Sequence, residues 1–400
     1  MVSPEIFIKD KNKQPPVITL VIMGFLVFSP FSTILVMKYF GLPISLPEVL
    51  FLPFLFIFRK RYYFASVVSI RSIIIISSWI LLILISILEA RYTVTIILSS
   101  SRTYLTLLIA YLFFSKANNV TLDDVMYISL GVTLGWLYSS IYEINSYLTG
   151  DVTTIALTGN MLAIPLLISI AAFKKHNKIL FFSIILLIAV SITSGMRREI
   201  VVFVVSLFLT FGFMSVGNTK QFLSKLFIIS IPVIFFFSFY SQIGKYVESN
   251  VPVLYYRVFQ KTEMLFSSKT GNTGDSDRLN NMSNKVNNFS EYLIPRGFVT
   301  RRTLEDDGGG YIDFPLSELL YMFGFLLTFI LLLIFGIQTF HCYKRSSITD
   351  NDGIIFVILS MIMFMLLFLE GTFLSSSYVA PFTGYCLGRL KFHSKLTFVL

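Results

Sequence analysis

Two adjacent arginines, Arg197 and Arg198, stand at the start of an apolar run over residues 199–216. Paired guanidinium groups at a helix N-terminus, where the helix dipole also favours negative charge, are suited to hold a phosphate or a diphosphate. The pair therefore predicts an anion clamp. Two alternatives remain: the pair only contacts lipid phosphates, or this connection faces the other side of a membrane.

Arg102 lies inside another apolar run, about 15 Å from Arg91 by the rise of an α-helix. An arginine in the middle of a membrane costs about 2.5 kcal/mol or more on insertion scales, so it should face a cavity or a carboxylate. It either binds a substrate or forms a structural ion pair with an acidic residue such as Glu143 or Glu370.

The acidic residues of the apolar runs gather near one end of their predicted spans, the end from which the long polar stretch 242–315 leaves. They are Glu48, Glu89, Glu143, Asp151 and Glu370. Together with the arginines they predict a polar cavity that opens at this end. A general base could come from this set or from Asp306, Asp307, Asp313 and Glu318.

The stretch 242–315 is the only long polar interruption of the chain. It contains Arg257, Arg278, Arg296, Arg301 and Arg302 and the run from Asp306 to Gly310. Its beginning, 253–266, predicts an amphipathic helix among lipid headgroups, and a second helix is expected from Ser276 or Asp277 to Pro295. The glycines at 271–274 and 308–310 predict a mobile lid.

Metal and histidine chemistry is not indicated. The triplet Asp275-Ser276-Asp277 has the acidic pattern of some metal-dependent sugar transferases, but Asp277 is better explained as a helix cap. His176, His341 and His393 do not reach the predicted outer face. No phosphate loop, nucleophile elbow or zinc-protease helix occurs.

Composition indicates a polytopic membrane protein. Of 400 residues, 55% are hydrophobic, 14% are charged and 42 are Phe, and the mean hydropathy is +0.77. The net charge of +10 does not indicate nucleic-acid binding, because the basic residues stand at the ends of apolar runs. Cys342 and Cys386 predict neither a disulfide framework nor a zinc site.

We expect an all-α protein with about twelve membrane spans. Nine spans fall in residues 1–241, the large loop is 242–315, and three spans fall in 316–400. They lie near residues 17–37, 42–58, 72–90, 92–114, 124–148, 152–173, 179–194, 199–216, 221–241, 316–340, 354–373 and 376–390. The positions of Lys and Arg predict that both termini lie in the cytoplasm and the loop lies outside, and a bacterial cytoplasmic membrane with the loop in the periplasm is the natural setting for this topology.

In these features the chain resembles the O-antigen polymerases, within the superfamily of O-antigen ligases and polymerases. The matching residues follow one another in order: Gly159-Asn160, Ser194-Gly195-Met196-Arg197-Arg198, Arg278, Pro295-Arg296-Gly297, Tyr311-Ile312-Asp313, and Glu318 to Gly324. The layout covers nearly the whole chain, and the order of these short motifs carries the resemblance.

The resemblance implies a glycosyltransferase of the integral-membrane GT-C type. Donor and acceptor would both be oligosaccharide units on undecaprenyl diphosphate, joined at the periplasmic face into O-antigen polysaccharide. It implies no metal or other cofactor. Membrane lipid and a chain-length regulator, a polysaccharide co-polymerase, are the expected partners, and nucleic acid is not. Ligases of the superfamily carry a histidine near the position of Asp313, so a polymerase is expected rather than a ligase.

The residue patterns and the resemblance together give a candidate site. The expected catalytic residues are Arg197, Arg198, Arg278, Glu143 and Asp313. The expected ligands of the diphosphate or of sugars are Arg102, Arg296, Arg301, Glu370, Tyr311 and Asn160. The alternative from another class is a flippase or transporter of lipid-linked oligosaccharides. Transporters tend to have inverted repeats and a site reachable from both faces, whereas one long loop favours a one-sided reaction.

Overall fold

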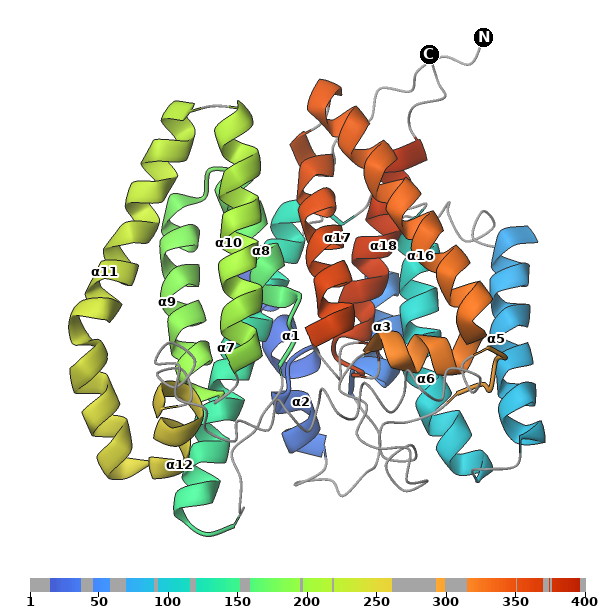
Figure 1. Ribbon diagram of the computed structural model, residues 1–400, viewed down its shortest axis with the longest axis horizontal. Coiled ribbons are helices and arrows are strands. Elements are labelled where there is room, and N and C mark those ends of the chain that lie inside the picture. The colour runs from blue at the N-terminus through green and yellow to red at the C-terminus, as the bar shows by residue number, and fades with distance from the viewer. Residues whose placement is uncertain are drawn as a thin grey trace.

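The computed structural model describes residues 15–36, 46–57, 70–89, 93–115, 120–151, 159–194, 197–217, 219–260, 293–298, 315–349, 351–369, 374 and 376–395. All regular secondary structure in these residues is helical, which confirms the predicted all-α class (Figure 1). The helices are α1 (Val17–Val27), α2 (Phe31–Ile34), α3 (Leu46–Ile57), α5 (Ile70–Leu88), α6 (Val94–Phe114), α7 (Leu122–Leu148), α8 (Ala163–Phe173), α9 (Asn177–Thr193), α10 (Arg197–Gly217), α11 (Thr219–Asn250), α12 (Pro252–Tyr255), the π-helical turn η3 (Tyr256–Gln260), α16 (Pro315–Thr349), α17 (Asn351–Leu369) and α18 (Ala380–Lys395).

Four of the described helices are long and apolar enough to cross a membrane. These stretches are Leu122–Leu148, Phe222–Asn250, Pro315–Ser346 and Asp352–Leu369. Shorter apolar helices of 10–17 residues are Val17–Val27, Ile75–Leu88, Ala163–Phe173, Asn177–Thr193 and Glu199–Ser215. The chain is thus a helical protein with candidate membrane spans, and the total of twelve spans stays a prediction.

Several predicted boundaries differ from the helices; the first predicted span, 17–37, for example, contains two separate helices, α1 and α2. The ninth predicted span ends at 241, but α11 continues to Asn250, so residues 242–250 belong to a helix and the connection starts at Val251. Pro381 falls inside the last predicted span, 376–390, where a proline is expected to break a helix, but it is the second residue of α18. Proline is tolerated in the first turn of a helix because the N–H groups there have no partner within the helix, so α18 runs unbroken to Lys395.

Glycines bring α1 and α7 into close contact. A Cβ atom added to Gly24 of α1 would collide with the carbonyl oxygen of Ile128, and one added to Gly131 of α7 would collide with that of Val21. Gly135, one turn later, meets Ser29 in the same way. From the contact of Gly131 with Val21 to the contact of Gly135 with Ser29 the residue numbers increase in both helices, so the two helices are parallel. Small residues four apart allow such close backbone approach between membrane helices.

Glycines also bring α6 and α18 into close contact. Gly384 of α18 lies against the carbonyl oxygen of Leu107 and the methyl group of Ala110, and Gly388 lies against the backbone of Tyr111. These helices are also parallel, because Gly384 and Gly388 meet successive turns of α6. The spacing Gly-x-x-x-Gly thus marks both tight interfaces, one in residues 131–135 and one in 384–388.

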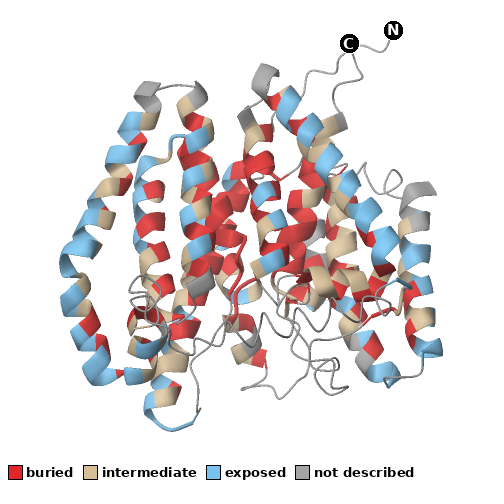
Figure 2. Ribbon diagram, viewed as in Figure 1, coloured by how far each residue is buried: buried red, intermediate tan, exposed pale blue. Residues whose placement is uncertain are grey.

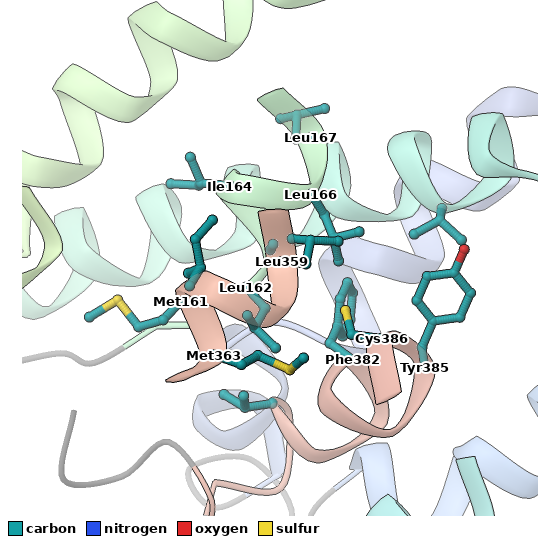
Figure 3. Close-up of a cluster of buried hydrophobic side chains, with 14 of the residues drawn as sticks. Met161, Leu162, Ile164, Leu166, Leu167, Leu359, Met363, Phe382, Tyr385 and Cys386 are labelled. Atoms are coloured by element: carbon teal, nitrogen blue, oxygen red, sulfur yellow. The ribbon is translucent and has the colours of Figure 1, made fainter. Parts of the chain in front are cut away.

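The core lies around α8. Every residue from Ala163 to Ala172 is buried, and α8 contacts α7, α9, α10 and α17. Figure 3 shows residues of its start, such as Leu162 and Leu166, beside Leu359 of α17 and Phe382 of α18. Buried residues gather in the centre of the bundle, while α11 and α16 expose much of their length (Figure 2).

The exposed faces of the outer helices are themselves apolar. Phe235 and Phe237 of α11 are 66% and 68% exposed, and Phe329 of α16 is 55% exposed. A soluble surface rarely carries such continuous apolar area, whereas lipid accepts it. These faces support the membrane interpretation of the composition.

Ion pairs and hydrogen bonds define one end of the bundle, which we call the basic end. Lys174 lies 2.7 Å from Asp352, and His176 lies 3.2 Å from Asp123. These contacts bring the turn after α8 to the starts of α7 and α17. Asp124 also closes the start of α7 in a capping box with Thr121.

The ends of α16 and α18 belong to the basic end as well. Arg345 donates a hydrogen bond to the carbonyl oxygen of His393 at 3.2 Å, and Lys391 donates to the hydroxyl of Tyr111 at 2.7 Å. Because α1 is parallel to α7, and α18 to α6, α1 begins and α18 finishes at this same end. The opposite end, where α11 ends and α16 begins, is called the loop end (Figure 1).

Candidate functional site

Arg102 forms an ion pair with Glu48 in the half of α6 nearest the loop end. Nε of Arg102 lies 3.2 Å from Oε2 of Glu48, and the hydroxyl of Thr103 donates to Oε1 at 3.1 Å. Glu48 stands in the first turn of α3, where the helix dipole favours a carboxylate. The Glu48 side chain is 8% exposed and that of Arg102 is 43% exposed. The carboxylate is therefore enclosed, while the Arg102 side chain is partly exposed.

The ion pair that the apolar surroundings of Arg102 indicated is thus present, but its partner is Glu48. Glu143 and Glu370 were the partners expected from the sequence. Glu370 lies outside the described residues, and Glu143 stands on α7, which belongs to a different part of the bundle.

Tyr104 and Glu318 are joined by a buried hydrogen bond. The hydroxyl of Tyr104 donates to Oε1 of Glu318 at 2.6 Å, and both residues are buried. Tyr104 follows Arg102 by two positions in α6, so the two side chains point to different sides of that helix. One side meets α3 and the other meets α16. The carboxyl group of Glu318 is thus held inside the bundle, close to the end where the long connection returns.

The last described piece of the connection, residues 293–298, is called the anchor segment. The backbone N–H of Phe298 donates to Oγ of Ser86 in α5 at 2.6 Å, and the Phe298 ring lies 5.4 Å from the Tyr104 ring, between centroids. Phe298 is only 2% exposed. The anchor segment therefore covers the Tyr104–Glu318 bond and ties the connection to α5.

The anchor segment is also bound to α16. The N–H groups of Arg296 and Gly297 donate to the carbonyl oxygens of Tyr321 and Met322 at 3.1 Å and 3.4 Å. The guanidinium carbon of Arg296 lies 5.9 Å from the centroid of the Tyr321 ring, which is within the range of a cation–π contact. Arg296, a predicted ligand of the diphosphate or of sugars, is therefore held at the loop end.

Two glycines with positive φ make this docking possible. Gly297 has a φ of 84°, and a Cβ atom there would collide with the hydroxyl of Ser86. Gly324 has a φ of 72° and interrupts the helical backbone inside α16. A Cβ atom on Gly324 would lie 2.8 Å from the carbonyl oxygen of Leu293. Only glycine combines this backbone conformation with such close approach.

The beginning of the connection packs on the other side of the bundle. Leu254, Val258 and Phe259 of α12 and η3 are buried in a small apolar cluster with the end of α11. Partly buried neighbours from α7, α9, α11 and α12 are Ile144, Tyr147, Ile192, Tyr240, Ile243 and Tyr255. The amphipathic helix predicted over 253–266 is present as far as Gln260, but its apolar face covers protein. Residues 261–266 lie outside the described part.

The two arginines of the predicted anion clamp, and two carboxylates, lie on helices at the loop end. Glu143, half-buried, precedes Ile144 in the last turns of α7. Arg197 and Arg198 are the first two residues of α10, although the structure describes only their backbone. Glu199 follows them, is fully buried and accepts a hydrogen bond from the hydroxyl of Ser194. The loop end thus carries acidic groups beside the backbone of both clamp residues.

Asn160 has a clear role in the fold. Its side-chain amide donates to the carbonyl oxygen of Tyr378 at 2.9 Å, and its Oδ1 accepts from the N–H of Leu162 at 3.2 Å. Asn160 is completely buried. The adjacent Gly159 lies against the Trp136 ring, where a Cβ atom would collide. The Gly159-Asn160 motif therefore joins the start of α8 to the segment before α18.

Several predicted site residues lie outside the described residues. They are Arg278, Arg301, Tyr311, Asp313 and Glu370, together with the Asp275-Ser276-Asp277 triplet and both glycine-rich stretches. Their predicted roles stay predictions. The structure brings Arg102 and Arg296 to the same end of the bundle as Glu143 and the backbone of the clamp.

Sequence reasoning missed three contacts of the site. Tyr104 gave no signal in an apolar helix, and its bond to Glu318 joins residues 214 positions apart. Ser86 was an isolated serine in an apolar run. Glu199 was detectable, because an acidic residue directly after two arginines at a helix start is unusual inside an apolar stretch.

No group of three or more His, Cys, Asp or Glu side chains is arranged to hold a metal ion in the part of the chain that the structure describes. Comparison of the chain with protein-family models, with curated proteins and with solved structures gave no match.

Proposed function

We propose that this protein is a polymerase of the O-antigen type, a membrane glycosyltransferase that joins oligosaccharide units carried on undecaprenyl diphosphate. The observation that carries the proposal is the gathering of charged groups at the loop end, where the long connection leaves and returns. Described examples are Glu48, Arg102, Glu143, Arg296 and Glu318. Charged side chains within membrane helices are costly and usually mark a substrate path.

In this proposal about twelve helices cross a bacterial inner membrane. The basic end faces the cytoplasm, because Lys174, Lys178, Arg345, Arg389 and Lys391 belong to it and cytoplasmic connections are rich in Lys and Arg. The loop end then faces the periplasm, with both termini in the cytoplasm. A reaction at the loop end would use lipid-linked substrates that have already crossed the membrane.

The chemistry of the proposal is a displacement at the anomeric carbon of the donor. A hydroxyl group of the acceptor sugar attacks this carbon, a new glycosidic C–O bond forms, and the C–O bond to the diphosphate breaks. Arg197, Arg198 and Arg278 stabilise the negative charge that develops on the leaving diphosphate. Glu143 or Asp313 accepts the proton of the attacking hydroxyl.

The substrate-binding groups of the proposal come from both halves of the bundle. Arg102 offers its outer guanidinium nitrogens, because its Nε is the atom that contacts Glu48. Arg296 is held on α16 by the anchor segment. In the proposal, Arg301, Tyr311 and Glu370 also bind the diphosphate or the sugars. No cofactor takes part, and a chain-length regulator would set the product length.

The attachment of the connection supports a lid. Its start is packed on α7, α9 and α11, and its end is bonded to α5 and α16. The residues between these two ends lie outside the described part of the chain. In the proposal these residues form a lid that brings Arg278 to a bound substrate and shields the reaction from water, while Asp313 belongs to the part of the connection that follows the anchor segment.

The test is polymerisation by purified protein in liposomes that contain lipid-linked repeat units. A ladder of products with several repeats on a gel is expected from the wild-type protein. Arg102→Ala should reduce the rate about 10²-fold or more, by analogy with the loss of one stabilising donor. Arg345→Ala, at the basic end, is the matched control and should retain the wild-type rate.

Other results would identify the alternatives. Transfer of single units between the two leaflets without joining would identify a flippase. Transfer to a lipid A core without growth of the chain would identify a ligase. Either outcome would overturn the polymerase proposal.

A further inference from the structure

Three lysines gather at the basic end where α9 and α11, which lie side by side, begin (Figure 1). Lys175 and Lys178 are exposed at the start of α9, whereas Lys225, in the second turn of α11, is only 3% exposed. The ammonium group of Lys225 donates a hydrogen bond to Oδ1 of Asn177, the first residue of α9. Lys175 is close enough for its charge to act on Lys225. We call these three residues the lysine cluster.

The lysine cluster has no acidic partner among the residues that the structure describes. The cations beside it do have such partners: Lys174 is paired with Asp352, and His176 lies against Asp123. No described Asp or Glu side chain comes within salt-bridge distance of the three ammonium groups of the cluster. A buried positive charge next to another positive charge is costly, and a bound anion would offset that cost.

The start of α9 adds to the positive potential of the lysine cluster. Its first turn contains no acidic residue, and the N-cap residue His176 makes no side-chain hydrogen bond to the helix. The start of α7 is different, because it is closed by Asp124. A helix N-terminus favours negative charge, yet this one carries Lys178. A phosphate group would complement the helix dipole and the ammonium groups together.

Exposed apolar side chains continue from the lysine cluster along both helices. Phe182 and Ile185 of α9 are exposed and follow Lys178 by four and seven positions, so the three share one face of that helix. On α11, Phe227 is exposed two positions after Lys225, and much of the helix beyond it is exposed as well (Figure 2). A ligand with an anionic headgroup and hydrocarbon chains matches both parts of this surface, whereas a soluble anion matches only the lysines.

We infer that the lysine cluster binds the phosphate headgroup of an anionic phospholipid whose acyl chains lie along the exposed apolar faces of α9 and α11. Basic sites between membrane helices at the cytoplasmic side are suited to such headgroups. The lipid would bridge the two helices, and α11 leads directly into α12 and the long connection. The inference uses the membrane interpretation of the chain and does not depend on the polymerase proposal.

The experiment measures binding of phosphatidylglycerol to the full-length protein in detergent by native mass spectrometry. We expect one tightly retained lipid on the wild-type protein. Phosphatidylcholine, whose headgroup has no net charge, should bind about tenfold more weakly or worse. Excess inorganic phosphate should not displace the phosphatidylglycerol. Equal binding of the two lipids, or displacement by inorganic phosphate, would overturn the inference.

Variants at exposed positions test where the lipid binds. The double variant Lys175→Gln with Lys178→Gln should weaken binding of phosphatidylglycerol about fivefold for each lysine removed. Lys245→Gln is the matched control, because it removes an exposed lysine from α11 at the loop end. Unchanged affinity in the double variant, or an equal loss in the control, would contradict the site.

Lys225→Gln separates a role in lipid binding from a role in the fold. Glutamine can still donate to Asn177 but carries no charge, so affinity for phosphatidylglycerol should fall about fivefold. In detergent without anionic lipid, the midpoint of thermal unfolding should stay at or above that of the wild type. A lower midpoint together with unchanged affinity would assign Lys225 to the fold alone and reject it as a lipid ligand. The exposed pair decides the matter even if this variant fails to fold.

Discussion

The hydroxyl of Tyr104 donates a hydrogen bond to the carboxyl group of Glu318 at 2.6 Å. The bond joins the first half of α6 to the start of α16, and the ring of Phe298 packs against Tyr104. In an apolar interior both partners would be costly to leave unpaired. The return of the long connection therefore rests on a polar contact inside the bundle.

Tyr104→Phe should lower stability by about 1–3 kcal/mol, because the buried carboxyl group of Glu318 loses its donor. The measurement is thermal unfolding of purified protein in detergent. Tyr343→Phe is the control, since Tyr343 is 46% exposed on α16. Equal midpoints for wild type and Tyr104→Phe would show that the bond does not stabilise the fold. In a Glu318→Gln background the effect of Tyr104→Phe should be smaller.

Gly384→Ala should separate α6 from α18 and lower the midpoint of thermal unfolding. The added methyl group has no room against Leu107 and Ala110. Gly336→Ala is matched in chemistry and helical position, but no atom lies within 4 Å of its added Cβ. That control should keep or raise stability, since alanine favours a helix over glycine by about 1 kcal/mol. Similar losses in both variants would contradict the close packing of α6 and α18.

Gly297→Ala should release the anchor segment from α5. The change combines an unfavourable positive φ, which costs roughly 1–2 kcal/mol, with a collision at Ser86. Gly150→Ala has the same backbone strain at a φ of 82° but an open surrounding. Limited proteolysis near Ile294, which is 70% exposed, should accelerate in the first variant alone. Equal cleavage rates would contradict the docking.

The Glu48–Arg102 pair should respond unequally to loss of its two members. Arg102→Gln leaves an enclosed carboxylate without its cation, whereas Glu48→Gln leaves a guanidinium group that is 43% exposed and can be hydrated. We expect Arg102→Gln to cost about 1–3 kcal/mol and Glu48→Gln to cost less. Thermal unfolding of both variants and of the double variant tests this order. A larger loss for Glu48→Gln would reverse the assignment of the enclosed group.

Cysteine labelling should place the basic end and the loop end on opposite sides of the membrane. Lys175→Cys reports on the first and Gly150→Cys on the second, and both positions are exposed. The native Cys342 and Cys386 are buried, so their background with a membrane-impermeant maleimide should be low. In intact cells only the Gly150→Cys variant should react. Reaction of Lys175→Cys instead would invert the proposed orientation.

Local patterns were sufficient to predict much of the architecture. Long apolar runs predicted helices, and all regular secondary structure in the described residues is helical. Arg102 indicated either an ion pair or a bound substrate, because an unpaired arginine is costly in such surroundings, and an ion pair with Glu48 is present. The motif Pro295-Arg296-Gly297 contributed to the family resemblance, and in the structure its Gly297 has the positive φ that only glycine adopts readily.

The sequence did not predict which residues of different helices contact each other. The side of α6 that meets α3 and the side that meets α16 both consist of apolar runs, and lipid is as apolar as a protein core. Periodicity therefore does not show which face of a membrane helix is buried. Glu48 as the partner of Arg102, and Glu318 as the partner of Tyr104, depend on how the helices rotate and which neighbours they meet.

The amino-acid sequence by itself determined that this is an all-α, apolar chain with charged residues at particular depths and one long polar connection. The cost of burying charge and backbone in an apolar medium dictates those features locally. Only the tertiary structure decided that glycines pack α1 on α7 and α6 on α18, and that the connection is fastened on opposite sides of the bundle. These contacts join residues far apart in the chain, so they exist only once the helices have packed.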